Sequence, residues 1–200
     1  MKNILDYFTI EGEIGGNQEW FRNVVMHVGG CGAATACDSC IYFALHRGME
    51  KLYPFDVAQL SKEDYIRFSM KMKPYIRPRA GGVKKLSMYI DGFSKYLEDI
   101  GETELSMKGF SGNHSFVEAA VFIKKQIDLG MPVPYLMLKH INPKYKDFVW
   151  HWFLCFGYQE EAEDLLIAVA TYGEASTFSL RELWETGYQE KGGLIEYLRT

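Results

Sequence analysis

The stretch Gly29-Gly30-Cys31-Gly32-Ala33-Ala34-Thr35-Ala36-Cys37 surrounds a cysteine with three glycines and follows it with small residues. Glycine adopts backbone angles that other residues avoid, so Gly29 and Gly30 suit a tight approach to a helix that begins near Cys31. A thiol there would face unpaired backbone N–H groups and the positive end of the helix dipole. Both favour the thiolate, the form that attacks carbonyl carbons. The alternative is a small residue buried in a tight turn, and the local sequence favours neither.

Length and composition predict one folded domain with a sizeable core. The chain has 200 residues, of which 48% are hydrophobic and 15% aromatic, far from a disordered composition. The net charge of −4 gives no electrostatic reason to expect nucleic acid or an anionic membrane as a partner. The basic residues Lys71, Lys73, Arg77, Arg79, Lys84 and Lys85 are interrupted by prolines and glycines, which favours a solvated loop.

The N-terminal residues contain no apolar core long enough for a signal peptide, and no apolar run approaches the length of a membrane span. We therefore expect a soluble, cytoplasmic protein with no membrane partner. In that compartment the four cysteines are better explained as free thiols, metal ligands or a nucleophile than as disulfides.

Hydrophobic periodicity and capping residues predict helices first and strands later. Helices are expected at 31–47, 61–73, 83–99 and 115–130, with a short one from Ser179 to Gly187. Strands are expected at 104–110, 131–138, 147–158, 164–172 and 194–198, whereas residues 1–28 read as a lead-in with little regular structure. This order indicates an α+β fold in a single domain over residues 1–200, with a helical half at about 29–130 and a β-rich half at about 131–200.

The cysteine spacing offers a weak zinc alternative. Cys37 and Cys40 form a Cys-x2-Cys pair, and Cys31 and His27 lie close by in the sequence. A second such pair is missing, and Cys155 is isolated on a predicted strand. Since Cys37 and Cys40 fall on the inward side of the predicted helix, we expect them to pack in the core. We expect neither a metal nor another cofactor.

His151 is the histidine that stands out. It lies in Val149-Trp150-His151-Trp152-Phe153-Leu154-Cys155-Phe156-Gly157-Tyr158, a segment otherwise almost wholly apolar and aromatic. A histidine there is costly unless it is hydrogen-bonded, and a core histidine bonded to a backbone carbonyl would satisfy this requirement. Together with a cysteine at a helix start, however, His151 becomes a candidate general base.

Three motifs in order resemble the C39-like branch of the papain-like cysteine peptidases. They are Gly-Cys-Gly-Ala-Ala at 30–34, Ile-Lys-Lys-Gln-Ile-Asp-Leu-Gly-Met-Pro-Val at 123–133, and His-Trp-Phe-Leu-Cys-Phe-Gly-Tyr at 151–158. The resemblance covers about residues 29–50 and 116–186. It implies a papain-like fold, in which the nucleophile helix packs on a C-terminal antiparallel sheet, with Cys31 as nucleophile and His151 as general base.

The resemblance also implies two supporting residues, and here the sequence departs from the family. The orienting Asp or Asn of the family falls at Thr171, with Glu174 and Asp164 as alternatives. The oxyanion-hole glutamine normally lies about half a dozen residues before the cysteine. The nearest amides are Asn23 and Gln18, and an insertion would let Gln18 serve beside the Cys31 N–H. Ala33 stands where the family usually has proline.

These residues lead to two functional hypotheses. The first is a cysteine peptidase, amidase or acyl-transfer enzyme that uses a Cys31–His151 dyad and an acyl-enzyme. Its substrate would be a peptide, an amide or a thioester. The second is a catalytically impaired papain-like domain that acts as a binding or scaffolding module, with the aromatic residues around Trp150 and Trp152 lining a groove or a partner surface.

Overall fold

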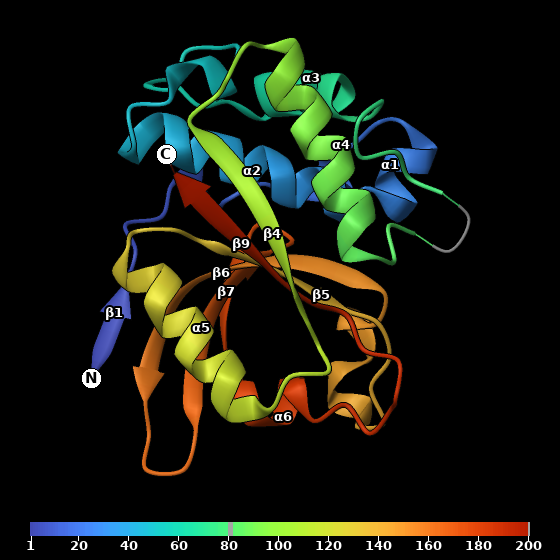
Figure 1. Ribbon diagram of the computed structural model, residues 1–200. Helices are drawn as coiled ribbons and strands as arrows, with labels where there is room; N and C mark the ends of the chain where they lie inside the picture. Colours follow the sequence, from blue (N-terminus) through green and yellow to red (C-terminus); the bar gives the residue numbers. More distant parts are fainter. Residues whose placement is uncertain (80–81, 200) are drawn as a thin grey trace.

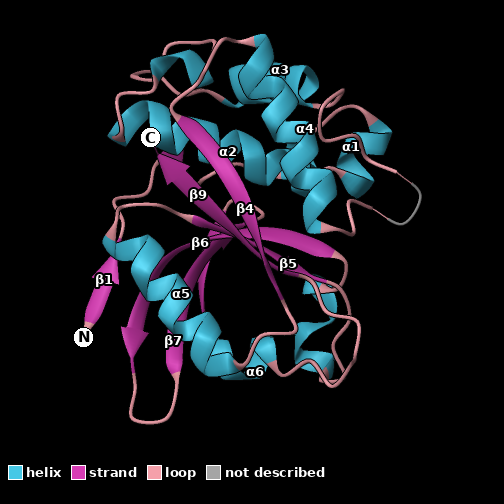
Figure 2. Cartoon of the chain, viewed as in Figure 1, coloured by secondary structure: helices cyan, strands magenta, loops and turns pink. Residues whose placement is uncertain are grey.

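A seven-stranded antiparallel sheet separates two groups of helices in the computed structural model, which describes residues 1–79 and 82–199 (Figures 1 and 2). The helices are α1 (Val24–Gly29), α2 (Cys31–His46), α3 (Lys62–Met72), α4 (Leu86–Asp99), α5 (Phe116–Asp128) and α6 (Leu180–Trp184). The sheet strands are β1 (Lys2–Ile4), β4 (Leu105–Ser111), β5 (Val133–Met137), β6 (His151–Glu160), β7 (Leu165–Thr171), β8 (Glu174–Ser179) and β9 (Gly193–Arg199). A two-stranded ribbon, β2 (Thr9–Ile10) and β3 (Glu13–Ile14), and the 3₁₀ turns η1 (Gln18–Trp20), η2 (Glu50–Leu52) and η3 (Pro143–Phe148) complete the described elements.

Local capping signals correctly predict where α3 and α5 begin. The Ser61 side chain accepts a hydrogen bond from the Asp64 N–H at the start of α3. Ser115 and Glu118 form a reciprocal capping box at the start of α5. The predicted helix at 31–47 is confirmed as α2, in which 13 of 16 residues are buried. Although α2 is long and buried, no helix in the described ranges is both long enough and apolar enough to cross a membrane.

The long strand β6 is the centre of the sheet, whose order is β4-β9-β5-β6-β7-β8. On one side, β5 pairs with its first half and β1 with its second half, while β7 pairs along the other side. The pairing of β1 with β6 corrects the expectation that residues 1–28 have little regular structure, as does α1. The expected strand at 147–158 was placed too early, because η3 occupies its first residues and β6 begins at His151. Strand β8 was not predicted.

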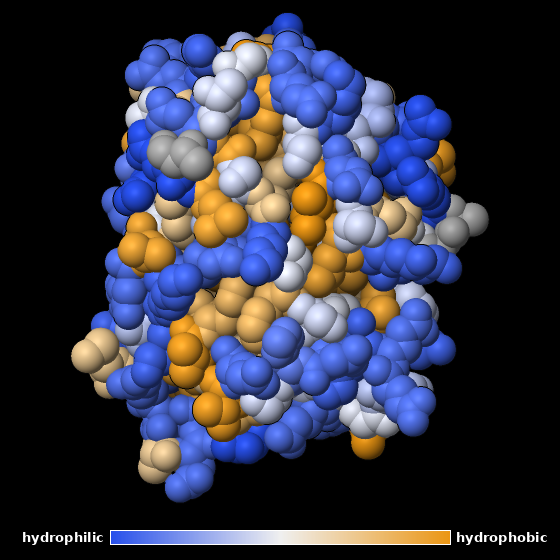
Figure 3. All heavy atoms as spheres, in the orientation of Figure 1, coloured by the Kyte–Doolittle hydropathy of each residue, from blue (hydrophilic) through white to orange (hydrophobic). Residues whose placement is uncertain are grey.

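The sheet carries a core on each face. On one face α2, α3 and α4 pack with Trp152 of β6 and Tyr197 of β9. On the other face α5 and α6 pack with Phe153 of β6 and Tyr135 of β5. Alternate residues of a strand face opposite sides, which is why neighbouring aromatic residues of β6 enter different cores. In Figure 3 apolar residues gather across the middle of the visible face, where the helical layer meets the sheet. The predicted α+β class is therefore confirmed.

Candidate active site

Cys31 is the first residue of α2 and lies at the floor of a cleft. Its N-cap is Gly30, where a Cβ atom would lie 2.3 Å from the Met26 carbonyl oxygen, so a larger residue would displace α1 from α2. The thiol is 7% exposed, and its Sγ lies 4.0 Å from the Trp150 carbonyl oxygen. The other three cysteines are fully buried. Only Cys31 combines a helix N-terminus with access to the cleft.

The environment of Cys31 favours the neutral thiol. Burial raises the pKa of the Cys31 thiol, and the backbone N–H groups of Trp152, Gly32 and Cys31 itself lower it by less. The sequence-based expectation that the helix start stabilises a thiolate is therefore wrong in its net direction. The N–H groups are present as expected, but removal of the sulfur from water outweighs them.

His151 begins β6, and both of its ring nitrogens have neighbours. Nε2 lies 2.7 Å from the Thr171 hydroxyl oxygen. The Tyr172 ring is stacked on the imidazole, with centroids 4.6 Å apart and an interplanar angle of 5°, and the Tyr172 hydroxyl lies 3.3 Å from Nδ1. Burial lowers the pKa of His151 to about 4. The imidazole is therefore neutral at physiological pH and can accept a proton.

A cleft of about 620 Å³ brings the predicted nucleophile and base together. Cys31 and His151 both line it, and Gln18 and Tyr172 line it beside them. The side chains come from η1, α2, β6 and the turn after β7, which lie far apart in the sequence. The Thr171 hydroxyl lies beside Nε2 of His151, whereas the Tyr172 hydroxyl lies beside the other ring nitrogen, Nδ1.

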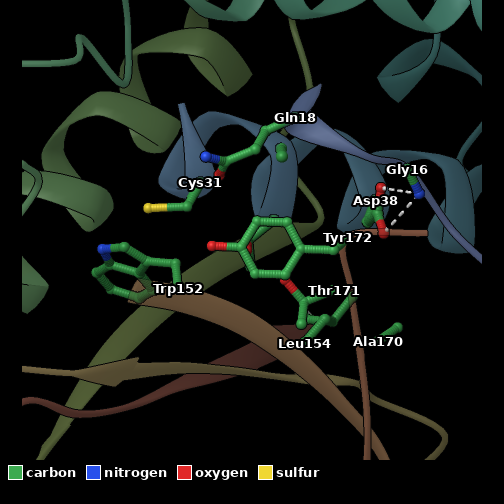
Figure 4. Close-up of a pocket in the computed structure, with 11 residues that line it drawn as sticks. Gly16, Gln18, Cys31, Asp38, Trp152, Leu154, Ala170, Thr171 and Tyr172 are labelled. Atoms are coloured by element: carbon green, nitrogen blue, oxygen red, sulfur yellow. Dashed lines mark hydrogen bonds between the residues drawn. The ribbon is translucent and has the colours of Figure 1, made fainter. Parts of the chain in front are cut away.

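Gln18 lines the cleft although α1 separates it from Cys31 in the sequence. Its Nε2 donates a hydrogen bond to the His27 carbonyl oxygen at 3.1 Å, and its buried Oε1 has no hydrogen-bond partner in the part of the chain that the structure describes. Figure 4 shows the amide group beside Cys31. Since an amide nitrogen carries two protons, the second N–H of Gln18 remains available. Asn23, the other candidate, instead caps α1 by accepting from the Met26 N–H.

The alternatives to Thr171 do not contact the imidazole. Asp164 accepts hydrogen bonds from the Ser179 hydroxyl and the Arg181 N–H at the start of α6. Glu174 is exposed and pairs with Thr171 across the β7–β8 hairpin. Of the three predicted candidates, only Thr171 is hydrogen-bonded to His151.

Tyr172 was not predicted from the sequence. It forms a two-residue hairpin turn with Gly173, and both have positive φ (54° and 75°), which is typical of a type I′ turn. Such turns favour Asn, Asp or Gly, so a tyrosine at this position carries backbone strain. Trp150, the neighbour of His151, also has a positive φ of 57°. The Tyr172-Gly173 pair at the end of the predicted strand was the available sequence signal, and the observed strand β7 ends one residue earlier, at Thr171.

Asp38, in the middle of α2, is buried near the site. Its carboxylate accepts hydrogen bonds from the hydroxyls of Tyr7 and Tyr65. It also accepts a hydrogen bond from the Gly16 N–H, which Figure 4 shows. Burial raises the pKa of Asp38 to about 6, against the lowering effect of these hydrogen bonds. Gly16 lies two residues before Gln18, so this network fixes the segment that carries the amide.

The described residues contain no group of three His, Cys, Asp or Glu side chains that could hold a metal ion. Cys37 and Cys40 are fully buried in the core that α2 shares with α3 and α4, as predicted. The zinc alternative with His27, Cys31, Cys37 and Cys40 therefore lacks a ligand group. Comparisons of the chain with protein-family models, with curated proteins and with solved structures give no match.

Proposed function

We propose that this protein is a thiol-dependent hydrolase or acyltransferase with a papain-like arrangement of its α+β fold. One observation carries the proposal: Cys31 at the start of α2 and His151 at the start of β6 line the same cleft. A nucleophile paired with an imidazole that a third group orients is the general signature of covalent acyl transfer. The substrate class is a peptide, an amide or a thioester.

In the first step the Cys31 sulfur forms a bond to the carbonyl carbon, and the carbonyl π electrons move to the oxygen. His151 removes the thiol proton as the bond forms, because the thiol and the imidazole are both neutral at rest. With Nε2 donating its proton to Thr171, the Nδ1 lone pair accepts the thiol proton. The tetrahedral intermediate then expels an amine or thiol, which takes the proton from the imidazolium.

In the second step water, or another nucleophile, attacks the acyl-enzyme, and His151 again takes the proton. The thioester bond to Cys31 breaks and the free thiol is restored. Thr171 carries no charge, so it orients the imidazole but stabilises the imidazolium less than an aspartate would. Because threonine occupies the position of the orienting aspartate, we expect turnover to be slow rather than absent.

The oxyanion would be bound by the Cys31 backbone N–H and the second N–H of Gln18. The donors at the start of a helix have no intrahelical partner, so the Cys31 N–H is free for this role. The hydrogen bond from Gln18 Nε2 to the His27 carbonyl keeps the amide in place beside Cys31. The site therefore has the donors that acyl transfer requires.

The binding-module alternative has its own support in the raised pKa of Cys31 and in the ring of Tyr172 against His151. One experiment separates the two functions. A panel of thioesters, activated esters and peptide amides is incubated with the protein and with the variants Cys31→Ala and Cys37→Ala. We expect turnover that Cys31→Ala abolishes and that Cys37→Ala retains, because Cys37 is buried in the core of the same helix. Turnover that survives Cys31→Ala would overturn the enzymatic proposal.

A further inference from the structure

Two cations line the cleft beside the candidate dyad. Arg79 and Lys84, on the segment between α3 and α4, share the cleft with Cys31 and His151. The cleft has no carboxylate among its lining residues. Within the described ranges, no ion pair joins Arg79 or Lys84 to a carboxylate, whereas Arg22, Lys95 and Lys144 each have one. The sequence suggested a solvated loop here, and the structure places two of its exposed basic residues in the lining of the cleft.

Buried neighbours anchor the backbone beside both cations. Pro78 is buried, and its Cβ lies 3.4 Å from where a Cβ on Gly29 would stand. Val83 is buried as well, and its carbonyl oxygen accepts a hydrogen bond from Trp152 Nε1 at 2.6 Å. Arg79 and Lys84 each directly follow one of these anchored residues. The backbone next to each cation is therefore anchored near the start of α2.

The rest of the cleft is apolar at its rim. Val28 is 76% exposed and Trp150 is 39% exposed, and both line the cleft. Burial chiefly raises the pKa of Tyr172, and the charges of Glu19 and Asp147, which are not among the lining residues of the cleft, raise it further. The cleft thus offers a positive wall and an apolar rim to a ligand bound at Cys31.

We infer that the acyl substrate carries a negatively charged group, a carboxylate or a phosphate, which binds Arg79 and Lys84 while the carbonyl lies at Cys31. This inference deepens the proposed function and rests on it for the acyl chemistry. A guanidinium and an ammonium without carboxylate partners attract an anion, and solvent partly screens this attraction because both side chains are exposed.

The matched reagents iodoacetate and iodoacetamide test the charge preference without requiring turnover. Both form a bond between the Cys31 sulfur and their methylene carbon and release iodide, and they differ mainly in charge. The rate of Cys31 modification is measured for each by mass spectrometry of the Cys31 peptide. The ratio of the iodoacetate to the iodoacetamide rate is then divided by the same ratio for glutathione.

We expect the normalised ratio to exceed one and to fall about fivefold in the Arg79→Gln/Lys84→Gln double variant, since two exposed ion pairs contribute that order of preference. High salt should lower the ratio in the same direction. The matched control is Arg77→Gln/Lys85→Gln, which removes two exposed charges from the same segment without touching the cleft lining. We expect the control to keep the ratio of the unmodified protein.

The inference is overturned if the normalised ratio is the same in the unmodified protein and in the Arg79→Gln/Lys84→Gln variant, here called the cleft variant. That result would leave the proposed function standing if turnover still depended on Cys31. The opposite result is also possible: turnover does not depend on Cys31, but the normalised alkylation ratio still falls in the Arg79→Gln/Lys84→Gln variant. That result would overturn the proposed function and leave an anion-binding cleft.

Glutarate and phenyl phosphate, tested separately as protectants against iodoacetamide, distinguish the two anions. Whichever of them slows modification of Cys31 in the unmodified protein, and less so in the cleft variant, identifies the group. Protection that is equally strong in both proteins would show that the two cations do not bind the anion.

Discussion

The ring of Tyr172 lies parallel to the imidazole of His151, with an interplanar angle of 5° and centroids 4.6 Å apart. Because the planes are parallel, the Tyr172 hydroxyl approaches Nδ1 from above the ring, away from the lone pair that lies in the imidazole plane. The contact therefore restricts the ring without occupying the position that accepts a proton. Figure 4 shows the same hydroxyl pointing toward Cys31. Tyr172 is thus placed to position the proposed general base.

Replacement of Tyr172 should separate turn strain from function. Tyr172→Asn suits a turn residue with positive φ, so the relief of strain offsets the lost ring contacts and the free energy of unfolding changes by less than about 1 kcal/mol. We expect acyl turnover to fall about tenfold or more, because the imidazole loses its stacking partner. Tyr172→Phe keeps the stack and should retain most of the activity. Equal activity of the Asn variant and the unmodified protein would exclude a positioning role.

For catalysis, the hydroxyl group of Thr171 should be more important than the volume of its side chain. Thr171→Val preserves the volume but leaves Nε2 of the buried imidazole without its partner, at a cost of about 1 kcal/mol in stability. We expect kcat to fall about tenfold and the pH profile of kcat/KM to shift, because the imidazole tautomer is no longer fixed. Thr171→Ser, which keeps the hydroxyl, should restore both. An unaltered profile in the Val variant would contradict the orienting role.

Gln18 should contribute to the transition state rather than to stability. Gln18→Ala removes the proposed oxyanion donor, so kcat should fall about 100-fold while KM changes little. The control is Asn23→Ala, which removes the cap of α1 and should cost about 1 kcal/mol of stability with a smaller effect on kcat. Steady-state kinetics and urea unfolding of both variants provide the comparison. A Gln18→Ala variant with unimpaired kcat would place the oxyanion elsewhere.

Alkylation of Cys31 should rise with pH throughout the neutral range. Because burial raises the pKa of the thiol above its ordinary value, the thiol form dominates at pH 7. The iodoacetamide rate should therefore increase about tenfold per pH unit between pH 6 and 8. A rate that is constant over this range would instead indicate a preformed thiolate–imidazolium pair. Unfolded protein, in which all four cysteines are exposed, gives the reference curve.

Stability between pH 4 and 6.5 should reflect two opposing groups. The pKa of His151 is lowered to about 4, so the unfolded chain binds more protons and its contribution makes stability rise with pH. The pKa of Asp38 is raised to about 6, so the folded protein binds more protons and its contribution makes stability fall with pH. Each contribution is of order 2–3 kcal/mol over the window, and in the unmodified protein they largely cancel.

Variants of Asp38 and His151 should reveal separately how each residue makes the free energy of unfolding depend on pH. We expect Asp38→Asn to make the free energy of unfolding rise more steeply from pH 4 to 6.5, and His151→Asn to make it fall, as measured by urea unfolding at several pH values. Slopes of the same sign in the two variants would contradict the assignment.

The sequence by itself determined the features that depend on neighbours within one or two helical turns. The Ser61 and Ser115 caps and the apolar stripe of α5 locate helices without reference to the rest of the chain. The glycine-flanked Cys31 and the histidine in an apolar strand gave the candidate pair, because both are unusual in their local contexts.

Only the tertiary structure decided which supports surround that pair. Three features join segments far apart in the chain: the pairing of β1 with β6, the contact of Thr171 with His151, and the presence of Arg79 and Lys84 in the lining of the cleft. The protonation state of Cys31 could not be predicted from the sequence either. The helix start predicts a low pKa for the Cys31 thiol, but the net direction depends on burial, which distant residues provide.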